Sequence, residues 1–421
     1  MIDKEQESGL YVPPPPPRIA FEGTLDDAQD FFQQTTPVAN CRNCPIAKYT
    51  DGLPIIIPTE EKVIEMLTGT SHSPEEEVAY QLDMRATSRL AGSLVTYARG
   101  YKTNVEKVAT VAVMAGCKPE YMPVCLAIAT AGGGSTNCPG TSSALNPYFV
   151  VSGPIAKEIG MNAGQASLDF GNPANVTLGR AAVLMTVSFG NCIIGAIRSD
   201  AGNPLHGKCF AEDAEGLPPG WEGLNEECYY YQNGERVYYT ANESVLGKGS
   251  TNTMTVQEYA PSSFRGLIGE GYGGMARRIG VEGTPGPHNF LEYVLPLYIP
   301  SFANNPWGSK TLLMHPNMAM SLYDYGFMKK AEVYEWMYES FHITAAEHRN
   351  YGWYDFMTAS GDRTEATSGM KYKDLPDDYL LPVFGTSSGS GNCIIVGNGF
   401  ADELCWGWNG RPSGYPIDPW K

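Results

Sequence analysis

The sequence has 421 residues, enough for about two or three domains or for one large domain with insertions. Hydrophobic residues make up 43% and aromatic residues 11%, which excludes a wholly disordered chain. The formal net charge of −17 disfavours nucleic acid and anionic membrane surfaces as partners. No basic and apolar leader and no apolar run of about 18 residues is present, so we expect a soluble, cytoplasmic protein.

Residues 1–48 are predicted to form an extended arm. Five consecutive prolines, Pro13–Pro17, favour the polyproline II conformation in this stretch. An arm of this kind could lie on a neighbouring subunit of a homo-oligomer, or it could be a flexible tail. Cys41 and Cys44 form the sole C-x-x-C spacing among ten cysteines, so a redox role for this pair stays open. We expect most of the other cysteines to be buried small apolar residues.

Residues 49–140 are predicted to be mainly helical, because helix-start signals recur along them. A short apolar strand is expected at Ile55–Ile57, before the first helix. Ser or Thr at a cap position, with Pro or Glu in the first turn, satisfies the N–H groups at a helix start. A glycine after the last apolar residue is typical of a helix end. The predicted helices run from Thr59 to Leu67, from Ser73 onward, from Thr103 to Gly116 and from Pro119 to about Ala131.

Residues 141–215 are predicted to form a first α/β half. The aromatic and β-branched run Tyr148–Val151 is typical of a buried strand. A brief helix that ends at Gly160 and a longer helix capped by Asn172 follow it. A further apolar run, Cys192–Ile197, predicts a second strand after the helices.

Residues 291–421 are predicted to form a second α/β half, because the same order of elements returns there. A strand runs into His315, a short and a longer helix follow, and the letters of 391–395 are those of 190–194. Two halves related by a pseudo-twofold would leave a cleft between them, where ligands often bind.

The segment 216–290 lies between these halves and is predicted to be a β-rich insertion. A hairpin turning at Asn233 and Gly234 is expected within it. The sequence therefore predicts an α/β protein with a helical N-terminal part, two pseudo-repeated α/β halves and a β-hairpin insertion.

A dense group of amide side chains predicts an anion site at the start of the helix after Gly171. The backbone N–H groups and the helix dipole favour negative charge at such a start, and an arginine lies two turns further on. The alternative is an ordinary helix cap with an arginine in a surface ion pair. The candidate substrate-binding residues are Asn162, Asn172, Asn175 and Arg180.

The stretch that begins at Asp200 concentrates charged and nucleophilic groups among glycine and proline, which predicts a loop with catalytic residues. His206 could act as a general base that Asp200 orients. Cys209, with Lys208 beside it, could have a lowered pKa and act as a nucleophile, and Glu212 could carry a proton. A divalent metal held by His206 with Asp200 or Glu212 is one alternative. A solvated acidic loop without a function is the other.

Short motifs over residues 50–225, and more weakly over 310–410, resemble segments of one known family. They include Asp51-Gly52-Leu53-Pro54, Met114-Ala115-Gly116-Cys117, Gly153-Pro154-Ile155-Ala156, Gly171-Asn172 and Cys209-Phe210-Ala211-Glu212. These motifs resemble a poorly characterised bacterial family found beside, or fused to, proteins with a U-G-S-C selenocysteine or C-G-S-C motif. The resemblance implies thiol- or selenol-linked chemistry on a small molecule, with a thiol-redox partner. This chain itself carries no C-G-S-C motif.

Together these observations predict an enzyme that acts on a small, anionic organic substrate. The expected chemistry is lyase-like acid–base catalysis with thiol assistance, and it requires the amide cluster and His206 to share one pocket. A metal-assisted hydrolase or hydratase is one alternative. A non-catalytic binding subunit of a thiol-redox system is the other.

Overall fold

The computed structural model divides the chain into two compact units. The first unit comprises residues 1–212, 223–257 and 413–421, and the second comprises 213–222 and 258–412. Each unit is therefore assembled from separate stretches of sequence. The residues that the structure describes are 21–38, 44–78, 103–130, 148–188, 207–227, 229–232, 235–238, 251–257, 310–350, 372–383, 393–397, 403–406 and 413–421.

The first unit is built on a sheet of six strands: β5 (Tyr148–Ser152), β6 (Cys209–Ala211), β7 (Tyr229–Gln232), β8 (Glu235–Tyr238), β9 (Thr253–Gln257) and β15 (Ser413–Pro416). Their order across the sheet is β6-β5-β9-β15-β7-β8. Strands β5 and β6 are parallel, whereas β9 runs antiparallel to both of its neighbours, β5 and β15. The aromatic and β-branched residues of β5 suit a strand covered on both faces, and all five are buried.

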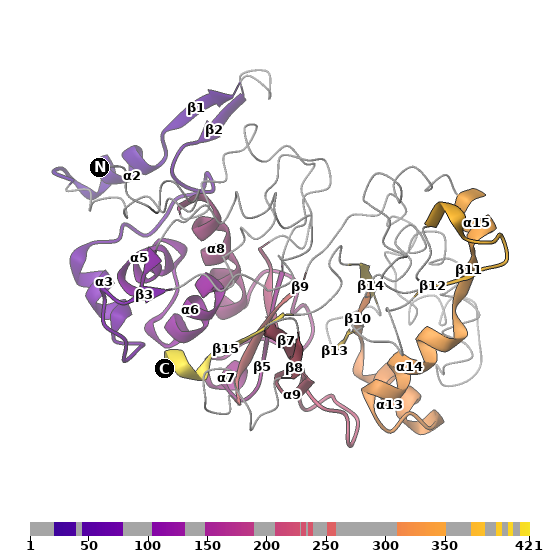
Figure 1. Ribbon diagram of the computed structural model, residues 1–421. Helices are drawn as coiled ribbons and strands as arrows, with labels where there is room; N and C mark the ends of the chain where they lie inside the picture. The colour runs from indigo at the N-terminus through magenta and orange to yellow at the C-terminus, as the bar shows by residue number, and fades with distance from the viewer. Residues whose placement is uncertain are drawn as a thin grey trace, which may run out of the picture. The chain divides into compact units, whose positions relative to one another are not determined.

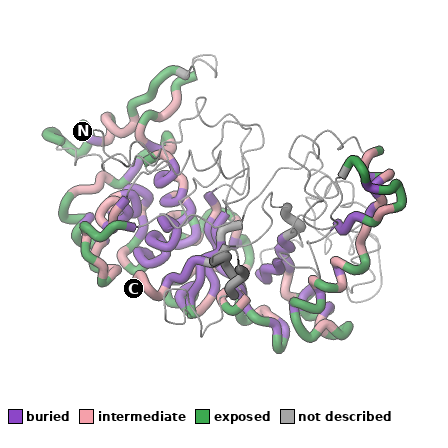
Figure 2. Tube along the Cα trace, viewed as in Figure 1, coloured by how far each residue is buried: buried purple, intermediate pink, exposed green. Residues whose placement is uncertain are grey.

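One face of this sheet packs on the helices α5 (Val105–Ala115), α6 (Met122–Thr130) and α8 (Pro173–Ser188), as Figure 1 shows. Phe149, Val151 and Met254 point to this face and join the apolar residues of the helices in one core. Figure 2 shows how much of these helices and of the sheet is buried. The first unit therefore has a helical layer on a mixed sheet, which agrees with an α/β class.

A glycine sets the distance between α8 and the start of β6. A Cβ atom on Gly179 would lie 2.1 Å from the carbonyl oxygen of Gly207, so no larger residue fits there without a backbone shift. Gly207 itself has a φ of +69°, a conformation that glycine adopts without strain.

The rest of the first unit consists of short elements around this core. Two two-stranded sheets pair β1 (Thr35–Val38) with β2 (Cys44–Ala47) and β3 (Glu77–Val78) with β4 (Thr103–Asn104). The remaining helices are α2 (Leu25–Phe32), α3 (Glu60–Leu67), η3 (Pro119–Tyr121), α7 (Ile155–Glu158), α9 (Leu224–Glu227) and η7 (Asp418–Trp420).

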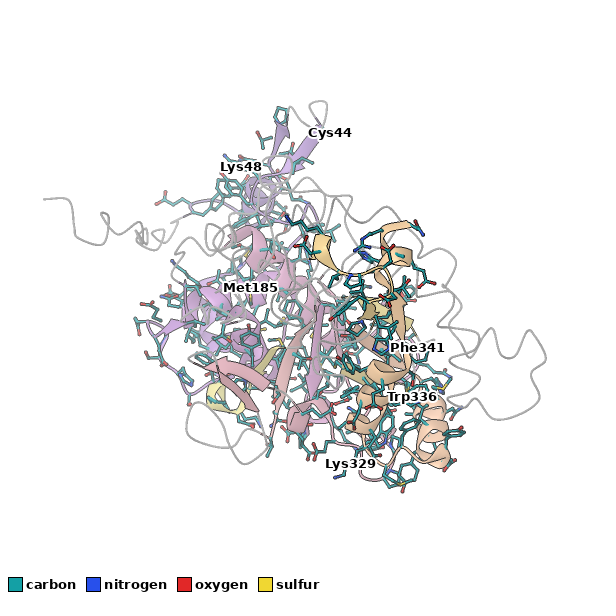
Figure 3. The ribbon with its side chains drawn as sticks, turned by 45° about the vertical axis from the view of Figure 1, so that its right-hand side comes forward. Cys44, Lys48, Met185, Lys329, Trp336 and Phe341 are labelled. Atoms are coloured by element: carbon teal, nitrogen blue, oxygen red, sulfur yellow. The ribbon has the colours of Figure 1, made fainter. Side chains whose placement is uncertain are left out.

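The second unit contains a three-stranded sheet of β10 (Lys310–Met314), β13 (Cys393–Val396) and β14 (Glu403–Trp406). The central strand β10 is parallel to β13 and antiparallel to β14. Its other elements are α13 (Pro316–Tyr325), α14 (Lys330–Ser340), β11 (His342–Thr344), α15 (Ala345–Asn350), η6 (Tyr372–Asp374) and β12 (Leu380–Pro382). Aromatic residues pack at the end of α14, where the rings of Trp336 and Phe341 meet edge to face with centroids 5.7 Å apart (Figure 3).

Several predicted elements are confirmed where local caps defined them. Thr59 caps α3 through its hydroxyl, which accepts a hydrogen bond from the N–H of Lys62. The helix expected to end at Gly116 is α5, and Gly116 has a φ of +88° there. Its cap is Asn104 rather than the predicted Thr103, because the Asn104 side chain accepts from the N–H of Lys107.

Three local predictions are wrong. The arm predicted for residues 1–48 is not extended throughout its described part, because α2 is a helix and β1 pairs with β2. No helix begins at Ser73; the chain turns there, with the N–H of Glu76 donating to the Ser73 carbonyl, and continues as β3. The Glu76 carbonyl instead accepts from the N–H of Val105, which ties this segment to the start of α5. Residues 55–57 form no strand either. The backbone N–H of Ile56 donates to the carbonyl of Met114, near the end of α5, rather than to a neighbouring strand. The predicted strand Cys192–Ile197 and the turn at Asn233 lie outside the described residues.

Candidate functional site

The predicted anion cluster is brought together at the start of α8, where its amides bind the chain. The Oδ1 atom of Asn172 accepts from the N–H of Asn175 at 3.0 Å, so Asn172 caps the helix as predicted. Asn175 is 3% exposed, and its amide nitrogen donates to the carbonyls of Asn162 and Ser167 at 2.9 and 3.0 Å. The Asn162 side chain closes its own turn by accepting from the N–H of Gly164. These contacts favour the cap alternative over an anion site.

The guanidinium of Arg180 is held by a different part of the chain. Its Nε atom lies 2.9 Å from Oδ2 of Asp51, and its terminal nitrogen donates to Oδ1 of Asp51 and to the Pro54 carbonyl at 3.1 and 2.7 Å. Both side chains are largely buried, with 22% and 12% exposed. Arg180 therefore fixes the turn at residues 51–54 onto α8, in agreement with the ion-pair alternative.

The predicted catalytic segment is only partly described, because Asp200 and His206 lie outside the described residues. Whether the amide cluster and His206 share a pocket stays a prediction. The segment is not a loop throughout, since residues 209–211 form β6. Four extended steps of about 3.3 Å separate Lys208 from Glu212, so their backbones stand roughly 13 Å apart at opposite ends of this strand.

The expectation of a reactive Cys209 is wrong. Successive side chains of a strand point to opposite faces, so Cys209 points into the core with Phe149 and away from the side on which Lys208 lies. Burial, and then the neighbouring Cys117, raise the pKa of the Cys209 thiol. The Sγ atoms of Cys117 and Cys125 lie 3.9 Å apart in the same core. These thiols are buried structural residues.

Among the predicted catalytic residues, Glu212 is held by hydrogen bonds in a buried polar cluster. It follows β6 directly and is 5% exposed. Its Oε2 atom accepts a hydrogen bond from the Ser152 hydroxyl at 3.0 Å and another from the N–H of Leu224 at 2.7 Å. A buried carboxylate with two donors is held in one orientation.

Glu212, Ser152 and Thr253 form a row across three neighbouring strands. Ala211 pairs with Val151 in the parallel register, which places Glu212 beside Ser152, and Ser152 pairs with Thr253. Residues paired across strands point to the same face, so the three side chains share the face opposite the helical layer. Ser152 is 1% and Thr253 0% exposed. We call these three residues the polar row.

The polar row is fixed in place by a hydrogen-bond network behind it. Asn252 is 1% exposed, and its Oδ1 atom accepts from the N–H of Ile155 at 2.7 Å. Its amide nitrogen donates to Asp418, which also accepts from the N–H of Thr251 at 2.7 Å. The start of α7, the start of β9 and the segment after β15 are therefore tied together next to the polar row.

The sequence did not single out Ser152, Asn252 or Thr253. Ser152 directly follows the predicted strand 148–151, and the other two lie in the predicted insertion. The signal that could have pointed to them is the position of polar residues directly at the ends of apolar strand runs. That signal becomes specific only once the strand order is known.

Within the described ranges, no group of three or more His, Cys, Asp and Glu side chains could hold a metal ion. None of the described helices combines the length and apolar character needed to cross a membrane. No known protein family matches the chain, and neither the curated proteins nor the solved structures contain a match.

Proposed function

We propose that this protein is an enzyme that acts on a small organic molecule by lyase-like acid–base catalysis, with Glu212 as the proton-transferring group. The observation that carries the proposal is the orientation of the Glu212 carboxylate by the Ser152 hydroxyl and the Leu224 N–H. This carboxylate lies just past the carboxyl ends of two adjacent parallel strands, β5 and β6. In α/β sheets, ligands commonly bind at that edge.

The proposed step is an elimination. The Glu212 carboxylate accepts a proton from a substrate carbon, and the electron pair of that C–H bond forms the new double bond as a hydroxide departs. The proton then passes from Glu212 to the departing oxygen, so that water leaves and the carboxylate is regenerated. Ser152 donates to the carboxylate and fixes which of its oxygens faces away from the strand.

Thiol assistance is not part of this proposal, because Cys209 is buried and its pKa is raised. The same holds for Cys117 and Cys125, which are buried; thiol chemistry at the exposed Cys44 stays a prediction. The metal-assisted alternative depends on His206, which is not described. An anionic substrate, a homo-oligomer, a thiol-redox partner and a cytoplasmic location stay predictions.

We also propose that residues 141–215 and 291–421 are repeated halves. In the first unit β5 is followed by α7, α8 and β6 and, after further elements, by β9; in the second unit β10 is followed by α13 and α14 and, after further elements, by β13 and β14. In each unit the first strand lies between a parallel and an antiparallel neighbour, and the parallel neighbour follows the helices. This shared order supports a repeat in which β6 corresponds to β13; the matching letters at 190–194 lie outside the described residues.

The test uses the full-length protein and a mixture of small hydroxy acids, sugars and amino acids in D₂O. Substrate loss and the appearance of a product lighter by one water are followed by mass spectrometry. Wild type is expected to convert at least one compound, and Glu212→Gln to lose about 100-fold or more of that rate. Glu222→Gln, which alters an exposed carboxylate, is the matched control. Full activity of Glu212→Gln would refute the assignment, whereas binding without any turnover would favour the non-catalytic alternative.

A further inference from the structure

Thr253, at the start of β9, carries a buried hydroxyl. Within the described residues, its Oγ1 atom has no hydrogen-bond partner, and the residue is 0% exposed. Buried hydroxyl groups are almost always hydrogen-bonded, because leaving water without a replacement partner is unfavourable. An exception at the start of a central strand, separated from a held carboxylate only by Ser152 in the same row, therefore needs an explanation.

The same strand contains a matched threonine that follows the ordinary rule. Thr255 lies two positions along β9, on the same face, and is also 0% exposed. Its hydroxyl donates to the Val150 carbonyl at 3.4 Å. The difference between Thr253 and Thr255 is thus not one of residue type, strand or burial. The two threonines differ in place: Thr253 lies in the polar row, and Thr255 lies two residues further along β9.

We infer that the Thr253 hydroxyl is a ligand contact, and that the polar row binds an uncharged, hydroxyl-bearing part of a small molecule. The Glu212 carboxylate in the row repels a second negative charge and accepts hydrogen bonds from a donor such as a hydroxyl. The Thr253 hydroxyl can donate to and accept from the same group. This inference rests on the proposed function and deepens it, since it names the chemistry of the group that lies next to Glu212.

The Thr253 hydroxyl lowers the folding stability of the ligand-free protein and contributes to ligand binding. A hydroxyl without a partner in the ligand-free protein weakens folding, so replacing it with a methyl group should not destabilise the chain. A hydroxyl that already has a hydrogen-bond partner stabilises the fold, so replacing it with a methyl group should destabilise the chain. Thr253→Val and Thr255→Val are therefore expected to move the melting temperature in different directions, although the substitution is the same.

The first experiment compares the melting temperatures of the full-length variants. Thr253→Val is expected to melt at or above the wild-type temperature, and Thr255→Val several degrees below it. A clear drop for Thr253→Val, equal to that of Thr255→Val, would show that the Thr253 hydroxyl already has a partner and would overturn the inference.

The second experiment uses glycerol as an uncharged hydroxyl probe and acetate as an anionic probe, each followed by saturation-transfer NMR. Wild type is expected to give a glycerol signal that falls at least fivefold in Thr253→Val and is retained in Thr253→Ser. Acetate is expected to give no signal that depends on Thr253. A glycerol signal unchanged in Thr253→Val, or an acetate signal lost in it, would contradict the inference.

Glu212→Gln separates this inference from the proposed function. If the glycerol signal depends on Thr253 but Glu212→Gln keeps full turnover, the polar row binds ligand and the catalytic role of Glu212 is wrong. If Glu212→Gln abolishes turnover while Thr253→Val changes neither glycerol binding nor KM, the catalytic proposal stands and the inference about Thr253 is wrong.

Discussion

Arg180 and Asp51 are joined by two hydrogen bonds of 2.9 and 3.1 Å, although 129 positions separate them in the chain. The pair holds the turn at residues 51–54 against α8, and the Pro54 carbonyl accepts a third bond from the same guanidinium. An arginine that the sequence suggested for substrate binding is thus engaged in stabilising the fold.

Arg180→Lys is expected to lower the free energy of unfolding by about 1–3 kcal/mol, because a lysine cannot make the two parallel bonds to Asp51. Urea unfolding followed by circular dichroism measures this change. Glu158→Gln removes an exposed pair with Lys421 and should cost less than about 0.5 kcal/mol. Equal effects of the two substitutions would mean that the Arg180 pair adds no more than an ordinary surface pair.

Gly179→Ala is expected to destabilise the first unit by about 2–4 kcal/mol, even though alanine favours a helix. The added Cβ atom would lie 2.1 Å from the Gly207 carbonyl oxygen, so α8 and the start of β6 must move apart. Thermal unfolding measures the loss. Val176→Ala, at an exposed position of the same helix, provides the comparison and should have little effect. An unchanged melting temperature for Gly179→Ala would show that the close approach is not present in solution.

Cys209 is expected to resist alkylation in the native protein, because burial raises the pKa of its thiol and keeps the reagent away. Iodoacetamide at pH 8, followed by peptide mass spectrometry, should label the exposed Cys44 within minutes and Cys209 only after denaturation. Rapid native labelling of Cys209 would reinstate it as a candidate nucleophile.

His72 is expected to make folding stability depend on pH. Burial lowers the pKa of its imidazole, but the hydrogen bonds to the Pro419 carbonyl and to Glu76, 2.8 Å away, outweigh burial and raise the pKa. Both partners accept, so the doubly protonated ring satisfies both. The stabilisation is therefore fully present below the unfolded pKa of about 6.5 and is lost as the pH rises through the folded value.

Urea unfolding of wild type and His72→Gln between pH 5.5 and pH 8.5 checks this dependence. The difference in midpoint between the two proteins should be largest at the acidic end and shrink toward pH 8.5. A difference that grows with pH would mean that the neutral ring, not the imidazolium, is the stabilising form.

Features that depend on neighbours in sequence were predictable. The caps Thr59 and Asn172 and the glycine at 116 mark helix ends because their hydrogen bonds and dihedral angles involve residues within one turn. The strand β5 was predictable from its apolar run. The segment after Ser73 failed because its backbone bonds to Val105, and no local rule anticipates a partner so distant.

The candidate site was less predictable than the fold. Glu212 could be singled out because it lies in a segment rich in charged and nucleophilic residues. The three-residue strand before it could not be recognised, because glycine, proline and charged residues surround it in the sequence. Ser152 and Thr253 join it only through strand order and register, which no local pattern determines. Arg180 was assigned to an anion because its true partner, Asp51, lies far away in sequence.

The position of β15 in the sheet has a consequence for how the chain is made. Residues 413–416 lie between β9 and β7, so the sheet that starts at residue 148 stays incomplete until the ribosome has made residue 416. Nearly the whole second unit is translated before that point. The six-stranded sheet can therefore be completed only after nearly the whole second unit has been made, and until then β9 exposes an edge that a chaperone or another nascent chain can bind.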